Sequence, residues 1–230
     1  MLQLTDLEQE ALALSLRVAL WAVGTGLPVA LAVAWLLARR DFPGKTLLNG
    51  VVHLPLVLPP VVVGYLLLLT FGRQGPVGSW LHDSFGVTIG FTWQGAALAA
   101  AVMAFPLMVR AIRLSLEAVD TRLESAARTL GAGRLEVFLT VTLPLTAPGL
   151  LAGAILGFAR SLGEFGATIT FVSNIPGETR TLPLALYSLV QQPGGEAGAL
   201  RIAVISVVLA LLALAGSELL ARRVKARIAG

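Results

Sequence analysis

Long runs of apolar residues alternate along the chain with short segments that carry the charged side chains. Residues 18–38 form a 21-residue run without a charge, and about 20 such residues let a helix cross the hydrocarbon core of a bilayer. Four more apolar segments follow, and we expect Pro144 and Pro148 to mark the start of the fourth span. The pattern predicts an all-α polytopic bundle of about five membrane-spanning helices, over residues 14–39, 50–71, 91–110, 146–165 and 199–221.

Prolines interrupt two of these predicted spans. Pro55, Pro59 and Pro60 lie in the second span and Pro106 lies in the third, and proline kinks or breaks a helix because it has no N–H to donate. Backbone groups freed in this way are tolerated at membrane depth only within protein or beside a water-filled cavity. Pro59 and Pro60 are therefore candidates for a translocation pathway, with ordinary membrane kinks as the alternative.

One further apolar segment, Leu182–Gln192, is too short to cross a bilayer. It contains about 11 residues, roughly half the number that a spanning helix requires. We expect a re-entrant, interfacial or external helix.

The charged residues support a membrane protein and indicate its orientation. They make up 13% of the chain, against about 25% in soluble domains. Residues 39–50, 110–136 and 222–230 hold 12 of the 17 Lys and Arg residues. Because such residues accumulate in cytoplasmic loops, we expect the N-terminus outside and the C-terminus in the cytoplasm. Residues 1–13 contain no Lys or Arg, so the first span is not expected to be a signal peptide.

Neither nucleic acid nor a metal is an expected ligand. The net charge of +4 arises in loops that flank the membrane, where it serves topology rather than nucleic-acid binding. The chain has no cysteine, and its two histidines, His53 and His82, lie 29 positions apart. No set of metal ligands is therefore apparent.

The loop between the third and fourth predicted spans has the pattern of a short helix. Asp120 is a suitable N-cap and Gly131 a suitable C-terminal stop, with a positive φ expected at the glycine. Glu124 and Arg128 can pair at i,i+4 on one face. Residues with small or apolar side chains recur at helical spacing on another: Leu123, Ala126, Ala127 and Leu130. Such a small-residue face lets another surface approach closely.

This loop resembles a motif of the permease subunits of binding-protein-dependent ABC importers, E-A-A-x3-G-x9-I-x-L-P. Ser125, Ala126 and Ala127 precede Gly131 at the required spacing, and Val141–Pro144 follows. Ser125 stands where the motif has Glu, and an acidic residue occurs one position earlier. The resemblance implies a coupling helix at about 120–131 that docks on a separate ATPase subunit. The residues implied in this contact are Glu124, Ser125, Ala126, Ala127, Gly131, Leu143 and Pro144.

Four other segments resemble the molybdate-transporting permeases: residues 54–65, 105–110, 158–167 and 174–181. The resemblance implies that residues 1–230 form one permease domain in a bacterial inner membrane, importing molybdate and possibly tungstate. Sulfate or thiosulfate is the alternative substrate. It also implies a homodimer, two cytoplasmic ATPase subunits and an external oxyanion-binding protein. ATP and Mg would bind to the ATPase subunits, so the chain itself is expected to bind no cofactor and to be no enzyme.

Arg160 and Glu164 lie one turn apart near the end of the fourth predicted span. Ionisable groups at membrane depth are costly and often mark function, but residues at i and i+4 can also pair. Two interpretations stay open: a structural ion pair, or an Arg160 guanidinium that attracts a passing oxyanion. Ser161 and Thr168 are nearby hydroxyl donors and join them as pathway candidates.

The fourth predicted span also carries Gly149, Gly153 and Gly157, one every four residues. Small residues at this spacing let helices approach closely in lipid. The glycine face is expected either to pack against another helix of the same chain or to lie at the centre of a dimer.

Two other classes of function are weaker. A secondary transporter would normally couple through a buried carboxylate, for which Glu164 is the only candidate. A membrane enzyme would need a nucleophile–base pair or a metal site, and the sequence places no cluster of His, Asp or Cys at one depth.

Overall fold

The computed structural model describes residues 4–229, with the side chains of Leu214 and of residues 217–229 outside the described part. The regular structure of residues 4–229 is entirely helical, as the sequence predicts. The elements are α1 Asp6–Arg39, α2 Lys45–Val57, α3 Pro60–Phe71, α4 Pro76–Phe85, α5 Trp93–Ala118, α6 Thr121–Thr129, α7 Arg134–Val137, the π-helical η1 Phe138–Thr142, α8 Leu143–Leu162, α9 Gly166–Val172, α10 Leu182–Val190 and α11 Glu196–Ala229.

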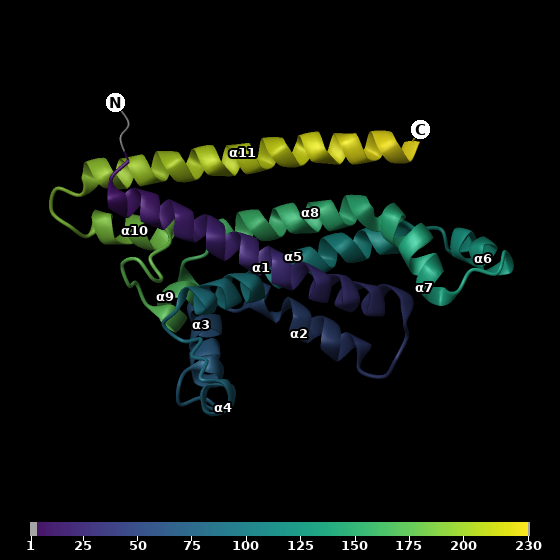
Figure 1. Cartoon of the computed structure of the whole chain (residues 1–230), viewed down its shortest axis with the longest axis horizontal. Helices are drawn as coiled ribbons and strands as arrows, with labels where there is room; N and C mark the ends of the chain where they lie inside the picture. The colour runs from purple at the N-terminus through teal and green to yellow at the C-terminus, as the bar shows by residue number, and fades with distance from the viewer. Residues whose placement is uncertain (1–3, 230) are drawn as a thin grey trace.

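Four long helices, α1, α5, α8 and α11, run side by side along the molecule (Figure 1). Among the described residues, helices long and apolar enough to cross a membrane occur at Asp6–Arg39, Trp93–Ala118, Arg134–Leu162 and Glu196–Ala213, and α2 with α3 provides a fifth if this bent pair is one span. Alanines fully buried on α1 and α5 allow these helices to approach closely: Ala22, Ala30, Ala34, Ala96, Ala99, Ala100 and Ala104.

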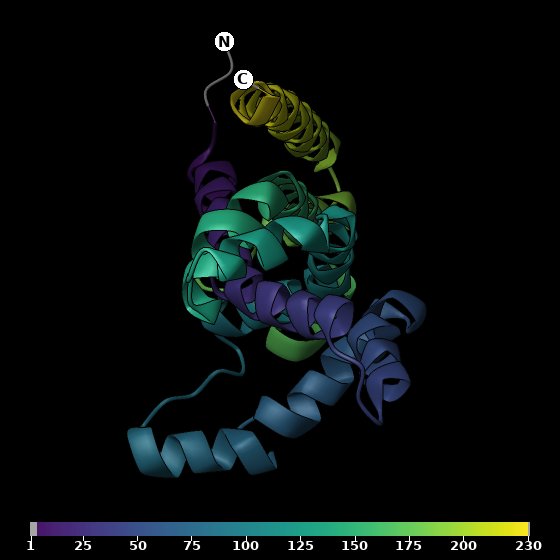
Figure 2. The ribbon, with the colours of Figure 1, turned by 90° about the vertical axis from the view of Figure 1, so that its right-hand side faces the viewer.

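The second predicted span is two helices, not one. α2 and α3 meet at an angle of 116°, and the break falls at Pro59, whose φ of −54° and ψ of 134° are extended. A residue that precedes a proline avoids the helical region, and Pro60 then suits the first turn of α3 because its N–H is not needed there. Pro55 and Pro106 lie inside continuous helices, so the adjacent pair of prolines produces the break. Figure 2 shows α3 and α4 projecting from one side of the bundle.

The fourth span begins earlier than expected. The helical path starts at Arg134 and continues through η1 to Leu162, so Pro144 and Pro148 lie within it and do not mark its start. The π-helical turn explains how a proline is accommodated: the Leu143 N–H donates to the Phe138 carbonyl, and the wider turn absorbs the donor missing at the next position.

The short apolar segment forms α10, and two further short helices, α4 and α9, were not predicted. α10 packs against α11 and α1, at the end of the bundle that holds the N-terminus (Figure 1). It is fixed there by the Leu182 N–H, which donates to the Ser15 Oγ at 2.7 Å. Nearby, the Arg201 guanidinium of α11 binds the buried Glu8 carboxylate of α1 at 2.8 Å.

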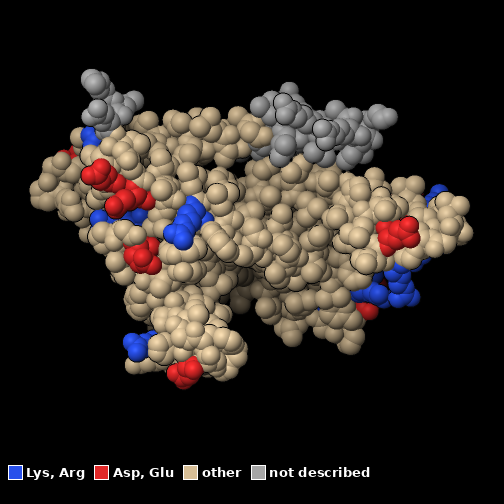
Figure 3. Space-filling model, in the orientation of Figure 1, with Lys and Arg blue, Asp and Glu red and all other residues tan. Residues whose placement is uncertain are grey.

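The two ends of the bundle differ in charge. The last turns of α1 and α11 lie toward the same end of the bundle as α6 and α7, opposite the start of α1 (Figure 1). This end, which we call the basic end, carries the first two of the three basic segments. The side chains of the third segment, Arg222, Arg223, Lys225 and Arg227, lie outside the described part. On the face in Figure 3 the charged side chains lie mainly near the two ends, with uncharged surface between them.

Candidate functional site

Helix α6 at the basic end is closed at both termini by its own sequence. The Asp120 carboxylate accepts a hydrogen bond from the Arg122 N–H at 2.9 Å, which makes Asp120 the N-cap. Gly131 has a φ of +95°, and its N–H donates to the Arg128 carbonyl at 3.0 Å. The predicted N-cap and the predicted positive φ are both confirmed.

The Glu124 carboxylate does not pair with Arg128 as predicted. Oε1 lies 2.9 Å from the Nη2 of Arg39, at the end of α1, and also accepts a hydrogen bond of 2.9 Å from the Thr142 Oγ1. The Arg39 and Glu124 side chains are 15% and 14% exposed. Glu124 thus pairs with a largely buried arginine of another helix rather than with the local Arg128, and it joins α6 to both α1 and η1.

The small-residue face of α6 is uncovered. None of its residues is buried. Leu123 is 51% exposed and Leu130 just beyond it is 88% exposed, while Ser125 and Ala126 are exposed and Ala127 is half-buried. Large apolar side chains beside small ones make this surface suitable for a second protein.

Beyond α6, the remaining residues of the motif follow η1. Leu143 is half-buried and Pro144 is exposed at the start of α8. The helix and these two residues are connected by the hydrogen bond from Thr142 to Glu124.

At the opposite end of α8, Arg160 and Glu164 form an ion pair with 2.6 Å between Nη1 and Oε2. The Glu164 side chain is 2% exposed and that of Arg160 is 26% exposed. The second carboxylate oxygen accepts a hydrogen bond from the Ala167 N–H at 2.8 Å. Glu164 therefore fixes the corner between α8 and α9 as well as neutralising Arg160.

This α8–α9 corner packs against the break between α2 and α3. A Cβ added to Gly166 would lie 2.7 Å from the Pro60 Cβ, and one added to Gly64 would lie 2.5 Å from the Ala167 carbonyl oxygen. Glycine at both positions lets the backbones of α3 and α9 meet. The structure thus brings Pro59 and Pro60 to the same region as Glu164, although the sequence separates them by about a hundred positions.

The two hydroxyl candidates near this corner are buried. Thr168 is 1% exposed, and Ser161 is 5% exposed. The Ser161 Oγ has no hydrogen-bond partner among the described residues, which is unusual for a buried hydroxyl.

The glycine face of α8 is covered by α5 of the same chain. A Cβ on Gly149 would collide with the Ser115 side chain, one on Gly153 would lie 3.3 Å from the Ile112 Cγ1, and one on Gly157 would lie 2.9 Å from the Met108 Cγ. The dimer-centre interpretation of this face is therefore wrong, because a second copy could reach it only by displacing α5.

Sequence reasoning missed Arg39 and Thr142 as partners of Glu124. The sequence identifies Arg39 only as a basic residue that indicates the orientation. No residue spacing could reveal a contact across 85 positions. Among the described residues, no group of three or more His, Asp or Glu side chains could hold a metal ion.

Comparisons with known proteins agree with this architecture. Residues 26–226 match the family of binding-protein-dependent transport system inner membrane components. The chain is 65% identical over 219 residues to the molybdenum transport system permease protein ModB of Escherichia coli (strain K12), covering 95% of this chain and 96% of that protein. It is 40% identical to the sulfate transport system permease protein CysT of the same strain, over 87% of this chain and 72% of that protein.

Solved structures share the fold. A chain of a bacterial alginate ABC transporter in complex with its pentasaccharide-bound periplasmic protein superposes with a TM-score of 0.76 at 16% identity, covering 96% of this chain and 80% of that one. A chain of an amino acid ABC transporter gives a TM-score of 0.64 at 22% identity, covering 94% of both chains. The chain therefore belongs to the binding-protein-dependent transport system inner membrane components.

Proposed function

We propose that this chain is the membrane-embedded permease subunit of an ATP-driven importer of molybdate and tungstate. The observation that carries the proposal is the 65% identity over 95% of the chain to a molybdenum transport permease. The sulfate transport permease is more distant, at 40%. Molybdate and tungstate share charge, tetrahedral shape and nearly the same size, whereas sulfate is smaller, so a pathway built for molybdate admits tungstate.

ATP hydrolysis belongs to separate subunits. Two ATPase subunits at the basic end bind ATP and Mg, while this chain converts their movement into opening and closing of a pathway. The docking surface is α6 and the start of α8, through Glu124, Ser125, Ala126, Ala127, Gly131, Leu143 and Pro144. The exposed small-residue face of α6 supports this assignment, because it leaves room for a groove to close around the helix.

Besides contributing to the docking surface, Glu124 transmits the movement of the ATPase to the membrane helices. Its carboxylate holds Arg39 of α1 and Thr142 of η1 at 2.9 Å each. A displacement of α6 is thereby passed to α1 and, through η1, to α8. These two helices form the centre of the bundle with α5.

A second copy of the chain completes the translocation pathway, and an external oxyanion-binding protein delivers the substrate to the end that holds the N-terminus. The pathway candidates are Arg160, Ser161, Glu164 and Thr168 at the α8–α9 corner, with Pro59 and Pro60 at the facing break. Arg160 remains 26% exposed beside a Glu164 that is almost fully buried. The guanidinium can therefore face a passing anion while its partner holds it in place.

The test is ATP hydrolysis by the purified complex, reconstituted in vesicles with its binding protein. Molybdate and tungstate should stimulate hydrolysis, and sulfate at the same concentration should not. Stimulation by sulfate alone would reassign the substrate. Oxyanion uptake by vesicles that contain this chain without an ATPase would instead establish a secondary transporter.

A further inference from the structure

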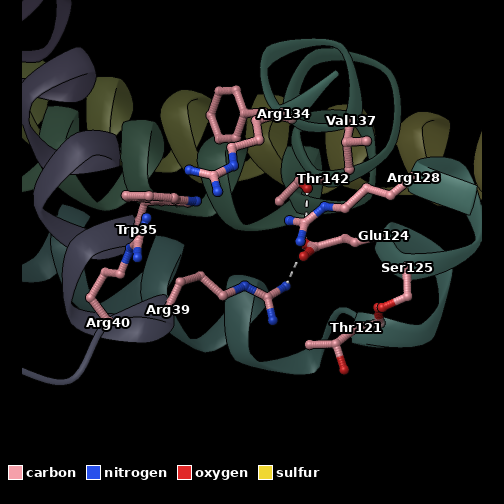
Figure 4. Close-up of a pocket in the computed structure, with 11 residues that line it drawn as sticks. Trp35, Arg39, Arg40, Thr121, Glu124, Ser125, Arg128, Arg134, Val137 and Thr142 are labelled. Atoms are coloured by element: carbon pink, nitrogen blue, oxygen red, sulfur yellow. Dashed lines mark hydrogen bonds and ion pairs between the residues drawn. The ribbon is translucent and has the colours of Figure 1, made fainter. Parts of the chain in front are cut away.

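A polar pocket of about 470 Å³ lies at the basic end of the bundle. It is open to one side and is lined by the end of α1, by α6 and by the turn from α7 into η1 (Figure 4). Four arginines line it, Arg39, Arg40, Arg128 and Arg134, and Glu124 is the one carboxylate among the lining residues that the structure describes. The lining therefore carries three more positive charges than negative ones.

The positive charge in this pocket is poorly neutralised. Glu124 is already bound to Arg39. Within the described part of the chain, Arg40, Arg128 and Arg134 have no carboxylate within 4.0 Å. The Nε of Arg39 is also buried and has no hydrogen-bond acceptor among the described residues. A buried donor without an acceptor is costly, so the lining has fewer acceptor oxygens than its guanidinium donors require.

The arginines come from different elements and converge. In Figure 4, Arg39 enters from α1 and Arg128 from α6, on opposite sides of the Glu124 carboxylate. Planar guanidinium groups match the oxygens of phosphate and similar anions and bind them in pairs of hydrogen bonds. Thr121 and Ser125 also line the pocket, and the Ser125 hydroxyl donates to the Thr121 carbonyl at 3.1 Å.

One side of the pocket carries residues typical of the boundary between water and lipid. Trp35 forms part of its wall, and the Arg40 Cζ lies 5.6 Å from the Trp35 ring centroid. Trp35 lies in the last turns of α1 and Arg40 is its C-cap. Tryptophan is enriched at the interface between membrane and water, and arginine in the cytoplasmic loops beside it. A ligand can therefore reach the pocket either from the aqueous side or from the lipid head groups.

We propose that this pocket binds a tetrahedral oxyanion of the phosphate type, supplied by an anionic lipid head group or by a free anion at the basic end. The anion would bind Arg128 and Arg134 and compete with Glu124 for Arg39. Occupancy would then loosen the contact between α6 and α1. This last consequence rests on the proposed coupling role of α6, whereas the binding itself does not.

The test uses the full-length protein with the subunits that copurify with it, and measures binding without transport or hydrolysis. One arm titrates inorganic phosphate in lipid-free detergent by calorimetry. The other compares thermal stability in nanodiscs of phosphatidylglycerol and of phosphatidylcholine. The test variant is Arg128→Gln/Arg134→Gln. The matched control, Arg110→Gln/Arg122→Gln, removes two exposed arginines from the same end that do not line the pocket.

If the anion is free, we expect the test variant to bind phosphate about tenfold more weakly. If the anion is a lipid head group, the test variant should lose the gain in thermal stability that phosphatidylglycerol gives over phosphatidylcholine. The control should behave like the wild type in both arms. The arm that responds identifies the source of the anion. A Glu124→Gln variant should bind the anion more tightly, because the competing carboxylate is gone.

Three results would overturn the proposal. The first is no binding in either arm. The second is an equal loss in the test and control variants, which would indicate diffuse attraction to the basic end. The third is a test variant that binds anions normally but loses an ATPase subunit, which would assign the pocket to an acidic side chain of that partner. None of these results bears on whether the importer transports molybdate.

Discussion

The Nη2 of Arg39 lies 2.9 Å from the carboxylate of Glu124, across 85 positions of sequence. The pair connects the end of a membrane-spanning helix to the short helix that we assign to ATPase coupling. Both side chains are largely screened from solvent, so their attraction is stronger than that of a surface ion pair.

Replacing Glu124 with Ala should uncouple hydrolysis from uptake. Asp120 and Gly131 still close α6, so an ATPase subunit should still copurify, but α6 loses its bonds to α1 and η1. The unpaired Arg39 should also lower stability by about 1–3 kcal/mol. The measurement is molybdate uptake relative to ATP hydrolysis in vesicles.

The matched control is Glu117→Ala. Glu117 pairs with Arg113 at 2.7 Å, but its side chain is 42% exposed, and exposed pairs contribute little. A Glu124→Ala protein with wild-type uptake per ATP would show that the Arg39 contact plays no part in coupling.

Replacing Gly131 with Leu should weaken the association with the ATPase while leaving membrane insertion intact. Space is not the obstacle, because a Cβ at this position meets nothing within 4 Å. The obstacle is the φ of +95°, which costs a residue with a side chain about 1–2 kcal/mol. Copurification of the ATPase subunit measures the effect.

Gly133→Leu supplies the comparison. Gly133 also has open space around its Cβ position, but its φ is −69°, so a side chain brings no backbone strain. Equal loss of the ATPase in both variants would mean that bulk, not the helix stop at Gly131, disturbs docking.

Replacing Arg160 with Ala should destabilise the protein, because it leaves the buried Glu164 unpaired. Removing one partner of a buried ion pair costs about 3–5 kcal/mol. The Arg160→Ala/Glu164→Ala protein should recover part of this loss but should still transport poorly, since the Arg160 charge is absent. Thermal unfolding and uptake, measured on the same preparations, separate the two effects. Full transport by the double variant would remove both residues from the pathway.

Replacing Gly149 with Ala should destabilise the contact between α5 and α8, because the new Cβ collides with Ser115. Combining it with Ser115→Gly should restore part of the stability if the two positions meet within one chain, because the Ala111 carbonyl oxygen stays 3.0 Å from the new Cβ and a glycine inside α5 has its own cost. Gly24→Ala is the control, since a Cβ there meets nothing within 4 Å and alanine favours a helix. Failure of the paired change to rescue thermal stability would argue against this contact.

The membrane-spanning helices could be predicted from the sequence, because the length and apolarity of a segment determine whether it can cross a bilayer. α6 could be predicted equally well, since Asp120 and Gly131 act on their own neighbours through local hydrogen bonds and backbone conformation. The two ends of α6 were therefore correct, while its ion pair was not.

The errors arose where tertiary contacts or helix geometry outweigh local pattern. Glu124 could reach Arg128 along α6, but the fold offers it Arg39 and Thr142 instead. The prolines of the fourth span suggested a boundary, yet a π-helical turn accommodates Pro144 within a longer helix. The glycine face of α8 was recognised as a packing surface, but only the structure identifies α5 as its partner.

The measurement that tests the account most directly is the uptake of radioactive molybdate by vesicles containing the complete complex, its binding protein and internal ATP. Uptake should require ATP. It should be inhibited by excess tungstate but not by sulfate at the same concentration. In the Glu124→Ala complex uptake should be lost while hydrolysis continues. Uptake that proceeds without ATP, or that excess sulfate abolishes, would contradict an ATP-driven molybdate importer coupled through α6.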